Sequence, residues 1–104
     1  MTYVDVGEAP DLKPGQCTRV ELDGRAVAVF RDGEDFVALD DACPHAAGPL
    51  SQGMLRGGEV ICPWHGWRFD ARTGACAVVP TVSTRAYDVR IEAGRMLLAP
   101  RDAG

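Results

Sequence analysis

Four residues of the kinds that bind metals occur as two pairs in this chain. The first pair is Cys43-Pro44-His45, and sixteen residues separate it from the second, Cys62-Pro63-Trp64-His65. Each pair offers one thiolate and one imidazole, so two similar loops folded face to face would bring two sulfurs together and two nitrogens together. The sequence therefore predicts a metal centre with the ligands Cys43, His45, Cys62 and His65.

Two kinds of metal centre use this set of ligands. A 2Fe-2S cluster would place the two cysteines on one iron and the two histidines on the other. Two imidazoles in place of two thiolates make the oxidised cluster neutral rather than doubly negative, which raises its reduction potential. A structural zinc site with two cysteines and two histidines is the alternative. The single residue between Cys43 and His45 fits the usual zinc-finger spacing poorly, which favours the cluster.

Short strands are expected to carry the two loops. Asp23-Gly24 separates two alternating apolar runs and is a strong hairpin signal. No segment offers three turns of helical periodicity, and the chain has 12 Gly and 7 Pro, so we predict an all-β domain of antiparallel strands. The expected strands are Cys17–Leu22, Arg25–Arg31, Asp35–Asp40, Glu59–Cys62, Trp67–Asp70, Ala75–Val79, Thr84–Glu92 and Arg95–Ala99.

Two segments rich in proline and glycine interrupt this strand pattern. They span about residues 41–54 and 62–66, and each contains one of the cysteine and histidine pairs. Loops on a rigid β scaffold often carry function, so both are predicted to be cluster-binding loops. A length of 104 residues indicates one domain, expected over residues 1–104.

The residues around the ligands are more specific than the ligand spacing. Residues 43–50 read Cys-Pro-His-Ala-Ala-Gly-Pro-Leu, residues 62–70 read Cys-Pro-Trp-His-Gly-Trp-Arg-Phe-Asp, and Thr73-Gly74 follows. Together these segments resemble the signature of Rieske-type 2Fe-2S ferredoxins, and the likeness covers most of the chain. The resemblance implies one Rieske 2Fe-2S cluster and the Rieske fold, with three small antiparallel sheets stacked together and both cluster-binding loops at one tip.

Two departures from the signature indicate the kind of Rieske protein. The Rieske subunits of quinol-oxidising complexes have a disulfide between the loops, where this chain has Gly48 and Trp64. Those subunits also carry serine and tyrosine hydroxyls that bond to sulfur, where this chain has Trp67 and Phe69. Hydroxyl donors of this kind stabilise the reduced cluster and raise its reduction potential. Because this chain lacks them, we expect a reduction potential near the lower Rieske limit, roughly −150 mV.

The resemblance implies a one-electron carrier with two protein partners. It would pass electrons from an NAD(P)H-linked, flavin-dependent ferredoxin reductase to a terminal ring-hydroxylating oxygenase in aromatic hydrocarbon catabolism. A small Rieske subunit of NAD(P)H nitrite reductase, or of another multi-subunit oxidoreductase, is the alternative, and a zinc-stabilised interaction module is a second one. Both histidines are already used as ligands, so the chain is expected to transform no organic substrate of its own.

Charge and hydropathy argue against other classes of protein. The net charge is −4, whereas nucleic acid binding needs a basic face, so we expect no nucleic acid partner. No apolar run approaches the roughly 20 residues of a membrane helix, and the first residues lack a basic leader or twin arginine. We therefore expect a cytoplasmic protein with no membrane partner.

Several residues near the loops have two interpretations each. Cys17 and Cys76 are expected to be unpaired and to behave as small hydrophobic residues rather than redox groups. Trp64 is expected to pack rather than to contact a partner. Three arginines near the second loop could be docking charges or ordinary surface residues: Arg56, Arg68 and Arg72.

Overall fold

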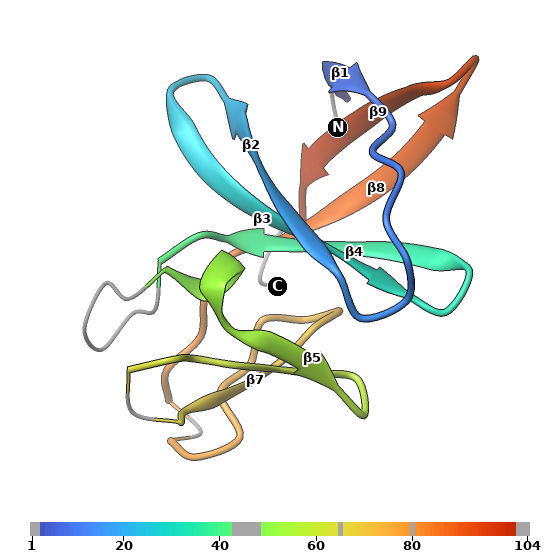
Figure 1. The fold of residues 1–104 in the computed structure, drawn as a ribbon. Coiled ribbons are helices and arrows are strands. Elements are labelled where there is room, and N and C mark those ends of the chain that lie inside the picture. Colours follow the sequence, from blue (N-terminus) through green and yellow to red (C-terminus); the bar gives the residue numbers. More distant parts are fainter. Residues whose placement is uncertain (1–2, 43–48, 65, 80, 102–104) are drawn as a thin grey trace.

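The computed structural model describes residues 3–42, 49–64, 66–79 and 81–101, which form two antiparallel sheets (Figure 1). A short 3-10 helix, η1 (Leu50–Gln52), lies between the fourth and fifth strands. The strands are β1 (Val4–Glu8), β2 (Cys17–Leu22), β3 (Arg25–Asp32), β4 (Asp35–Asp40), β5 (Met54–Arg56), β6 (Glu59–Ile61), β7 (Arg68–Asp70), β8 (Ala86–Glu92) and β9 (Arg95–Pro100). The predicted all-β antiparallel fold is confirmed.

The larger sheet has six strands in the order β1-β9-β8-β4-β3-β2. Its β2–β3 turn follows the expected hairpin chemistry, because Asp23 and Gly24 both have positive φ, 51° and 79°. The strongly twisted sheet curls until β1 contacts β2, without pairing with it. No helix in this described part of the chain is long and apolar enough to cross a membrane.

The number of sheets differs from the expectation. The resemblance implies three stacked sheets, whereas the described residues form one sheet of six strands and one of three, β5-β6-β7. The difference arises where β4 pairs with β8 through only two pairs of residues, Ala38↔Tyr87 and Leu39↔Ala86. This short ladder joins β2–β4 to β1, β8 and β9, so two of the expected sheets are continuous.

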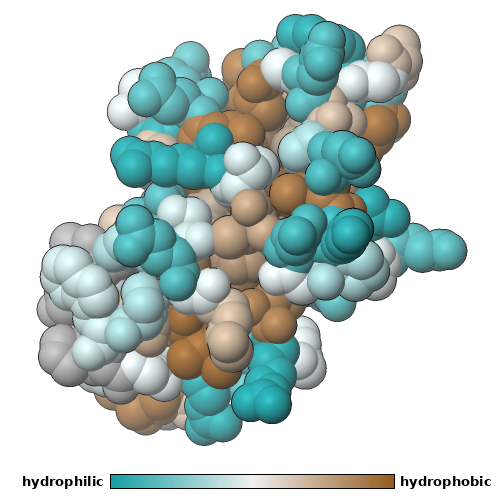
Figure 2. Space-filling model, viewed as in Figure 1, coloured by the Kyte–Doolittle hydropathy of each residue, from teal (hydrophilic) through white to brown (hydrophobic). Residues whose placement is uncertain are grey.

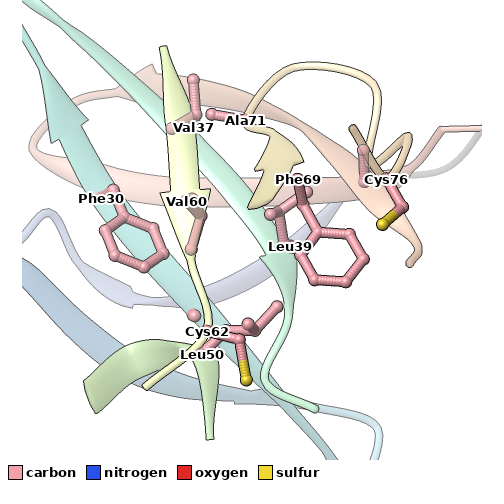
Figure 3. Close-up of a cluster of buried hydrophobic side chains, with 11 residues drawn as sticks. Phe30, Val37, Leu39, Leu50, Val60, Cys62, Phe69, Ala71 and Cys76 are labelled. Atoms are coloured by element: carbon pink, nitrogen blue, oxygen red, sulfur yellow. The ribbon is translucent and has the colours of Figure 1, made fainter. Parts of the chain in front are cut away.

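Two clusters of buried side chains stabilise the fold. The inter-sheet core lies between the two sheets and includes Phe30, Leu39, Leu50, Val60, Cys62 and Phe69 (Figure 3). The inner core lies within the curl of the six-stranded sheet and consists of Leu22, Val27, Val29, Ala38, Tyr87, Met96 and Leu98. Strands β3 and β4 supply both clusters with alternate residues, because successive side chains of a strand point to opposite faces.

Some strand predictions need correction. Ala75–Val79 is not a strand and forms only the isolated bridges Phe69↔Cys76 and Ala75↔Ser83. The expected strand Thr84–Glu92 begins two residues later, at Ala86. Strands β1 and β5 were not predicted.

Candidate metal centre

The second predicted ligand loop connects β6 to β7 and is closed by two backbone hydrogen bonds. The N–H of Cys62 donates to the carbonyl of Trp67 at 2.7 Å, and the N–H of Gly66 donates to the carbonyl of Cys62 at 3.0 Å. Gly66 has a φ of +69°, which glycine adopts without strain. These features fix the backbone on both sides of residues 63–65.

Cys62 occupies the first position of this loop and belongs to the inter-sheet core. It is 1% exposed and forms no disulfide. Figure 3 shows its sulfur pointing away from the side chains of Val60 and Phe69. An unpaired thiol held at the start of a closed loop suits a metal-binding thiolate.

One carboxylate joins two residues of the first predicted ligand loop, on either side of Cys43 and His45 in the sequence. The N–H of Ser51 donates to Oδ1 of Asp41 at 2.6 Å, and the hydroxyl of Ser51 donates to Oδ2 at 2.7 Å. Asp41 directly follows β4, and Ser51 lies in η1. The carboxylate therefore joins the first residue of the predicted loop, directly after β4, to η1 further along the same loop.

Three of the four predicted ligands, Cys43, His45 and His65, lie outside the described residues. Within residues 3–42, 49–64, 66–79 and 81–101, no group of three or more His, Cys, Asp or Glu side chains could hold a metal ion. The geometry thus supports Cys62 and the bases of both loops, and the full ligand set stays a prediction.

The two remaining cysteines are unpaired, as predicted. Cys76 is buried in the inter-sheet core, and half-buried Cys17 packs against the same core. The Sγ of Cys17 donates to the carbonyl of Ser51 at 2.7 Å. Burial raises the pKa of the Cys17 thiol, and the nearby charge of Asp41 raises it further. Both effects disfavour the reactive thiolate, which agrees with a packing role.

Trp64, which was expected to pack rather than to contact a partner, is largely exposed among the described residues. Its side chain is 56% exposed, although it lies two residues after the buried Cys62. A large exposed aromatic residue beside a proposed ligand is a candidate contact for a protein partner.

The three arginines near the second loop differ in their surroundings. A side-chain nitrogen of Arg68 lies 3.7 Å from a carboxylate oxygen of Glu59, and one of Arg72 lies 3.4 Å from a carboxylate oxygen of Asp32 at the end of β3. Arg56 forms no ion pair with any residue that the structure describes. Arg68 and Arg72 therefore have partners within the fold, and Arg56 is the better candidate for a docking charge.

A family model decides which chemistry these loops support. The model of the Rieske [2Fe-2S] domain matches residues 2–92, a range that includes both loops. The chain belongs to the Rieske [2Fe-2S] domain family. Its cofactor is accordingly a Rieske-type 2Fe-2S cluster, as predicted, rather than a zinc ion. The buried free thiol of Cys62 fits this group, which takes up and releases one electron when bound.

Two related proteins match most of this Rieske chain in sequence. Ferredoxin CarAc of Metapseudomonas resinovorans is 37% identical over 99 residues, which cover 93% of this chain and 92% of the relative. The 4beta-methylsterol monooxygenase of Methylococcus capsulatus is 38% identical over 103 residues, but this chain spans only 28% of its length. The Rieske domain thus occurs both as a small ferredoxin and as part of a longer protein.

Solved structures give the same assignment. The ferredoxin of carbazole 1,9a-dioxygenase from Nocardioides aromaticivorans IC177 has a TM-score of 0.84 and 40% identity, covering 97% of this chain and all of that one. A complex of reduced oxygenase and oxidised ferredoxin in carbazole 1,9a-dioxygenase matches with a TM-score of 0.80 and 36% identity, covering 92% of this chain and 100% of that one. These likenesses support an electron carrier of the Rieske ferredoxin type.

A third solved structure is named as an NADH-dependent nitrite reductase small subunit from Mycobacterium tuberculosis. It has a TM-score of 0.82 and 29% identity, covering 99% of this chain and 97% of that one. The same Rieske domain is therefore also similar to a protein named as a subunit of a larger enzyme.

Proposed function

We propose that this chain is the ferredoxin component of a ring-hydroxylating oxygenase system. It carries single electrons from an NAD(P)H-linked flavin reductase to the terminal oxygenase and acts on no organic substrate itself. The observation that carries this proposal is the match along the whole length of the carbazole dioxygenase ferredoxin, with 40% identity. Such a match favours a free carrier formed by one domain over residues 1–104.

The proposed cluster ligands are Cys43, His45, Cys62 and His65. Support comes from Cys62, which is free, buried and placed at the start of a loop that backbone hydrogen bonds close. Further support comes from Ser51 and Asp41, which are hydrogen-bonded on either side of Cys43 and His45 in the sequence. Cys17 and Cys76 are left out of this set because their sulfurs already bond to backbone groups: the Sγ of Cys17 donates to the carbonyl of Ser51, and the Sγ of Cys76 accepts the N–H of Val79 at 3.3 Å.

The ligand set is tested by electron paramagnetic resonance of the dithionite-reduced protein, with iron and acid-labile sulfide assayed on the same sample. We expect a rhombic signal with the low average g value of histidine ligation, and two irons per chain. The variants Cys43→Ser, His45→Ala, Cys62→Ser and His65→Ala should lose this signal, whereas the matched controls Cys17→Ser and Cys76→Ser should keep it. A signal typical of all-cysteine ligation would contradict the assignment.

The oxygenase partner is supported by the solved complex between a related ferredoxin and its oxygenase. Trp64 offers this chain an exposed aromatic contact next to the second loop. Figure 2 shows a small brown, hydrophobic surface at the bottom of the molecule, next to the grey residues at its lower left. We place the exchange in the cytoplasm, where the free thiols of Cys17 and Cys76 would stay reduced.

A nitrite reductase subunit is the second candidate, because one such subunit has a TM-score of 0.82 with this chain. Affinity purification of the tagged chain from its native cells separates the two functions. A free ferredoxin should elute without a stoichiometric partner, and it should then support oxygenase turnover when a flavin reductase and NAD(P)H are added. Co-elution with one large redox subunit at equal stoichiometry would favour the second candidate.

A further inference from the structure

The carboxylate of Asp41 is buried at the base of the first ligand loop. Its side chain is 1% exposed, and its own N–H donates to the carbonyl of Ala26 at 3.0 Å. Oδ1 accepts the N–H of Ser51 and Oδ2 accepts the hydroxyl of the same residue, at 2.6 and 2.7 Å. Both oxygens of one carboxylate thus bind one residue that lies ten positions further along the chain.

The other groups around Asp41 complete a small network. Arg19 approaches Oδ2 from the surface, with Nε at 3.6 Å. The Sγ of Cys17 donates to the carbonyl of Ser51, so Ser51 is held through its N–H, its hydroxyl and its carbonyl. A buried charge of this kind is costly unless it is paired and hydrogen-bonded, and replacement by apolar residues is often neutral for stability. All bonds of the Asp41 carboxylate in this network go to Ser51 or to Arg19, so its role is to fix the position of Ser51.

The network also reaches the second ligand loop through η1. Leu50 is fully buried in the inter-sheet core beside Cys62. Gly53 follows the helix so closely against β6 that an added Cβ would overlap the carbonyl of Ile61. Ile61 directly precedes Cys62. One continuous series of contacts therefore runs from Asp41 through η1 to the start of the second loop.

We propose that Asp41 is a positioning residue for the iron-sulfur cluster. By binding the N–H and the hydroxyl of Ser51, it fixes the distance between the end of β4 and η1, and through η1 the position of both relative to Cys62. This inference rests on the proposed ligands Cys43 and His45, which lie between Asp41 and Ser51 in the sequence. Asp41 does not contact iron in this scheme and acts only through the loop.

Three variants test the proposal. Asp41→Ala removes both bonds to Ser51. Asp41→Asn keeps the shape, since an amide oxygen can accept the Ser51 N–H and an amide N–H can donate to its hydroxyl. Tyr87→Phe is the matched control, because it removes a hydroxyl that donates to the neighbouring Asp40 on the inner-core face.

Two readouts report on the loaded protein: the g values of the reduced cluster, and the rate at which visible absorbance is lost in the presence of an iron chelator. We expect Asp41→Ala to shift and broaden the g values and to lose the cluster on the order of tenfold faster, since bonds to a charged group are lost. Asp41→Asn should restore the wild-type g values and bring the rate of loss close to that of wild type. Tyr87→Phe should leave the g values unchanged.

The outcomes separate this inference from the proposed ligand set. A wild-type protein without a histidine-ligated signal would refute the ligands themselves. A wild-type signal that persists unchanged in Asp41→Ala, with cluster loss no faster than in Tyr87→Phe, would overturn the positioning role alone. If Asp41→Ala does not fold, Ser51→Ala removes only the hydroxyl and should shift the signal in the same direction, and an unchanged signal there would overturn the role.

Discussion

Asp40, the last residue of β4, and Asp41, which follows it, have their carboxylates on opposite faces of the six-stranded sheet. Asp40 accepts a hydrogen bond from the hydroxyl of Tyr87 in the inner core, whereas Asp41 binds Ser51 at the base of the first loop. This division follows from the alternation of side chains along a strand. Each acidic residue thus fixes one neighbour: Asp40 holds β8, and Asp41 holds the segment that leads back from the loop.

The environment of Tyr87 predicts its titration. Burial, followed by the carboxylate of Asp40, raises the pKa of Tyr87 from 10.0 to about 12. The absorbance of tyrosinate near 295 nm, taken as the difference between wild type and Tyr87→Phe, should therefore show a midpoint close to pH 12. Because the folded pKa exceeds the unfolded one, the stability due to this hydroxyl is complete below pH 10 and is lost as the pH rises toward 12. A midpoint near pH 10 would contradict the prediction.

The exposure of Trp64 predicts a defect in partner binding. We expect Trp64→Ala to weaken the affinity for the proposed oxygenase partner by roughly tenfold, since tryptophan is enriched among interface hot spots and this one is exposed. The reduction potential of the Trp64→Ala variant should stay at the wild-type value. Binding is measured by titration calorimetry and the potential by voltammetry. Ile91→Ala is the control, because Ile91 is also exposed but lies on β8 of the larger sheet, and equal losses in both variants would refute a specific role.

At the scale of elements, the helix η1 is the part that connects the two loops. It packs on β2 and β3 on one side, and Gly53 continues it against β6 on the other. A glycine is needed at residue 53 because of space rather than backbone conformation, since its φ is −83°. The close approach lets β5 pair with β6 directly after the helix.

Substitution of Gly53 tests this contact. Gly53→Ala should lower the free energy of unfolding by about 1–3 kcal/mol, because the new methyl group overlaps a backbone carbonyl that no side-chain movement can relieve. Urea denaturation followed by circular dichroism measures the loss. Gly33→Ala is the comparison, since Gly33 has a φ of +62° in open space and should lose about 1 kcal/mol through backbone strain alone. A smaller loss for Gly53→Ala than for Gly33→Ala would contradict the close packing.

The sequence predicted the strands that carry clear patterns. β2 and β4 agree with their predicted bounds, because apolar alternation and glycine turns delimit them. β5 has only three residues and begins at Met54, inside the segment predicted as a loop, and the alternation of β1 is broken by a register shift between Asp5 and Gly7. Both strands form because a neighbouring strand is available, which is a tertiary property.

In the candidate site, too, the residues with a clear sequence pattern were predicted and the contacts that depend on the fold were not. The four ligand residues were predicted from their types and spacing. The bond between Asp41 and Ser51 was not, because aspartate and serine are ordinary loop residues and their pairing depends on the path of the chain between them. Trp64 was expected to pack because it could shield the cluster from water, whereas its side chain is 56% exposed, and exposure depends on the path of the loop rather than on the residue type.

At the scale of the whole molecule, the two sheets share one hydrophobic interior. Phe30 and Leu39 from the larger sheet contact Val60 and Phe69 from the smaller one within the inter-sheet core. Neither sheet can bury these side chains alone. The two sheets, and with them the two ligand loops, are therefore expected to unfold as one unit.

A core substitution should reveal this coupling. Leu39→Ala should lower the free energy of unfolding by about 2–5 kcal/mol. Loss of cluster absorbance and loss of β structure should then occur at the same urea midpoint, which is lower than that of the wild type. The control Arg72→Ala removes the surface ion pairs of Arg72 with Asp32 and Asp35 and should lower the free energy of unfolding by less than about 1 kcal/mol. Separate midpoints for bleaching and for circular dichroism would show that the sheets are independent.

The pairing of the first strand with the last has an evolutionary consequence. Val4 of β1 lies opposite Leu98 of β9, so the polypeptide enters and leaves the six-stranded sheet through neighbouring strands. A unit of this form can be joined to other sequences at either end without rearranging its interior. Such a unit can form one domain of a longer protein, as in the 4beta-methylsterol monooxygenase, where the matching segment makes up 28% of the length.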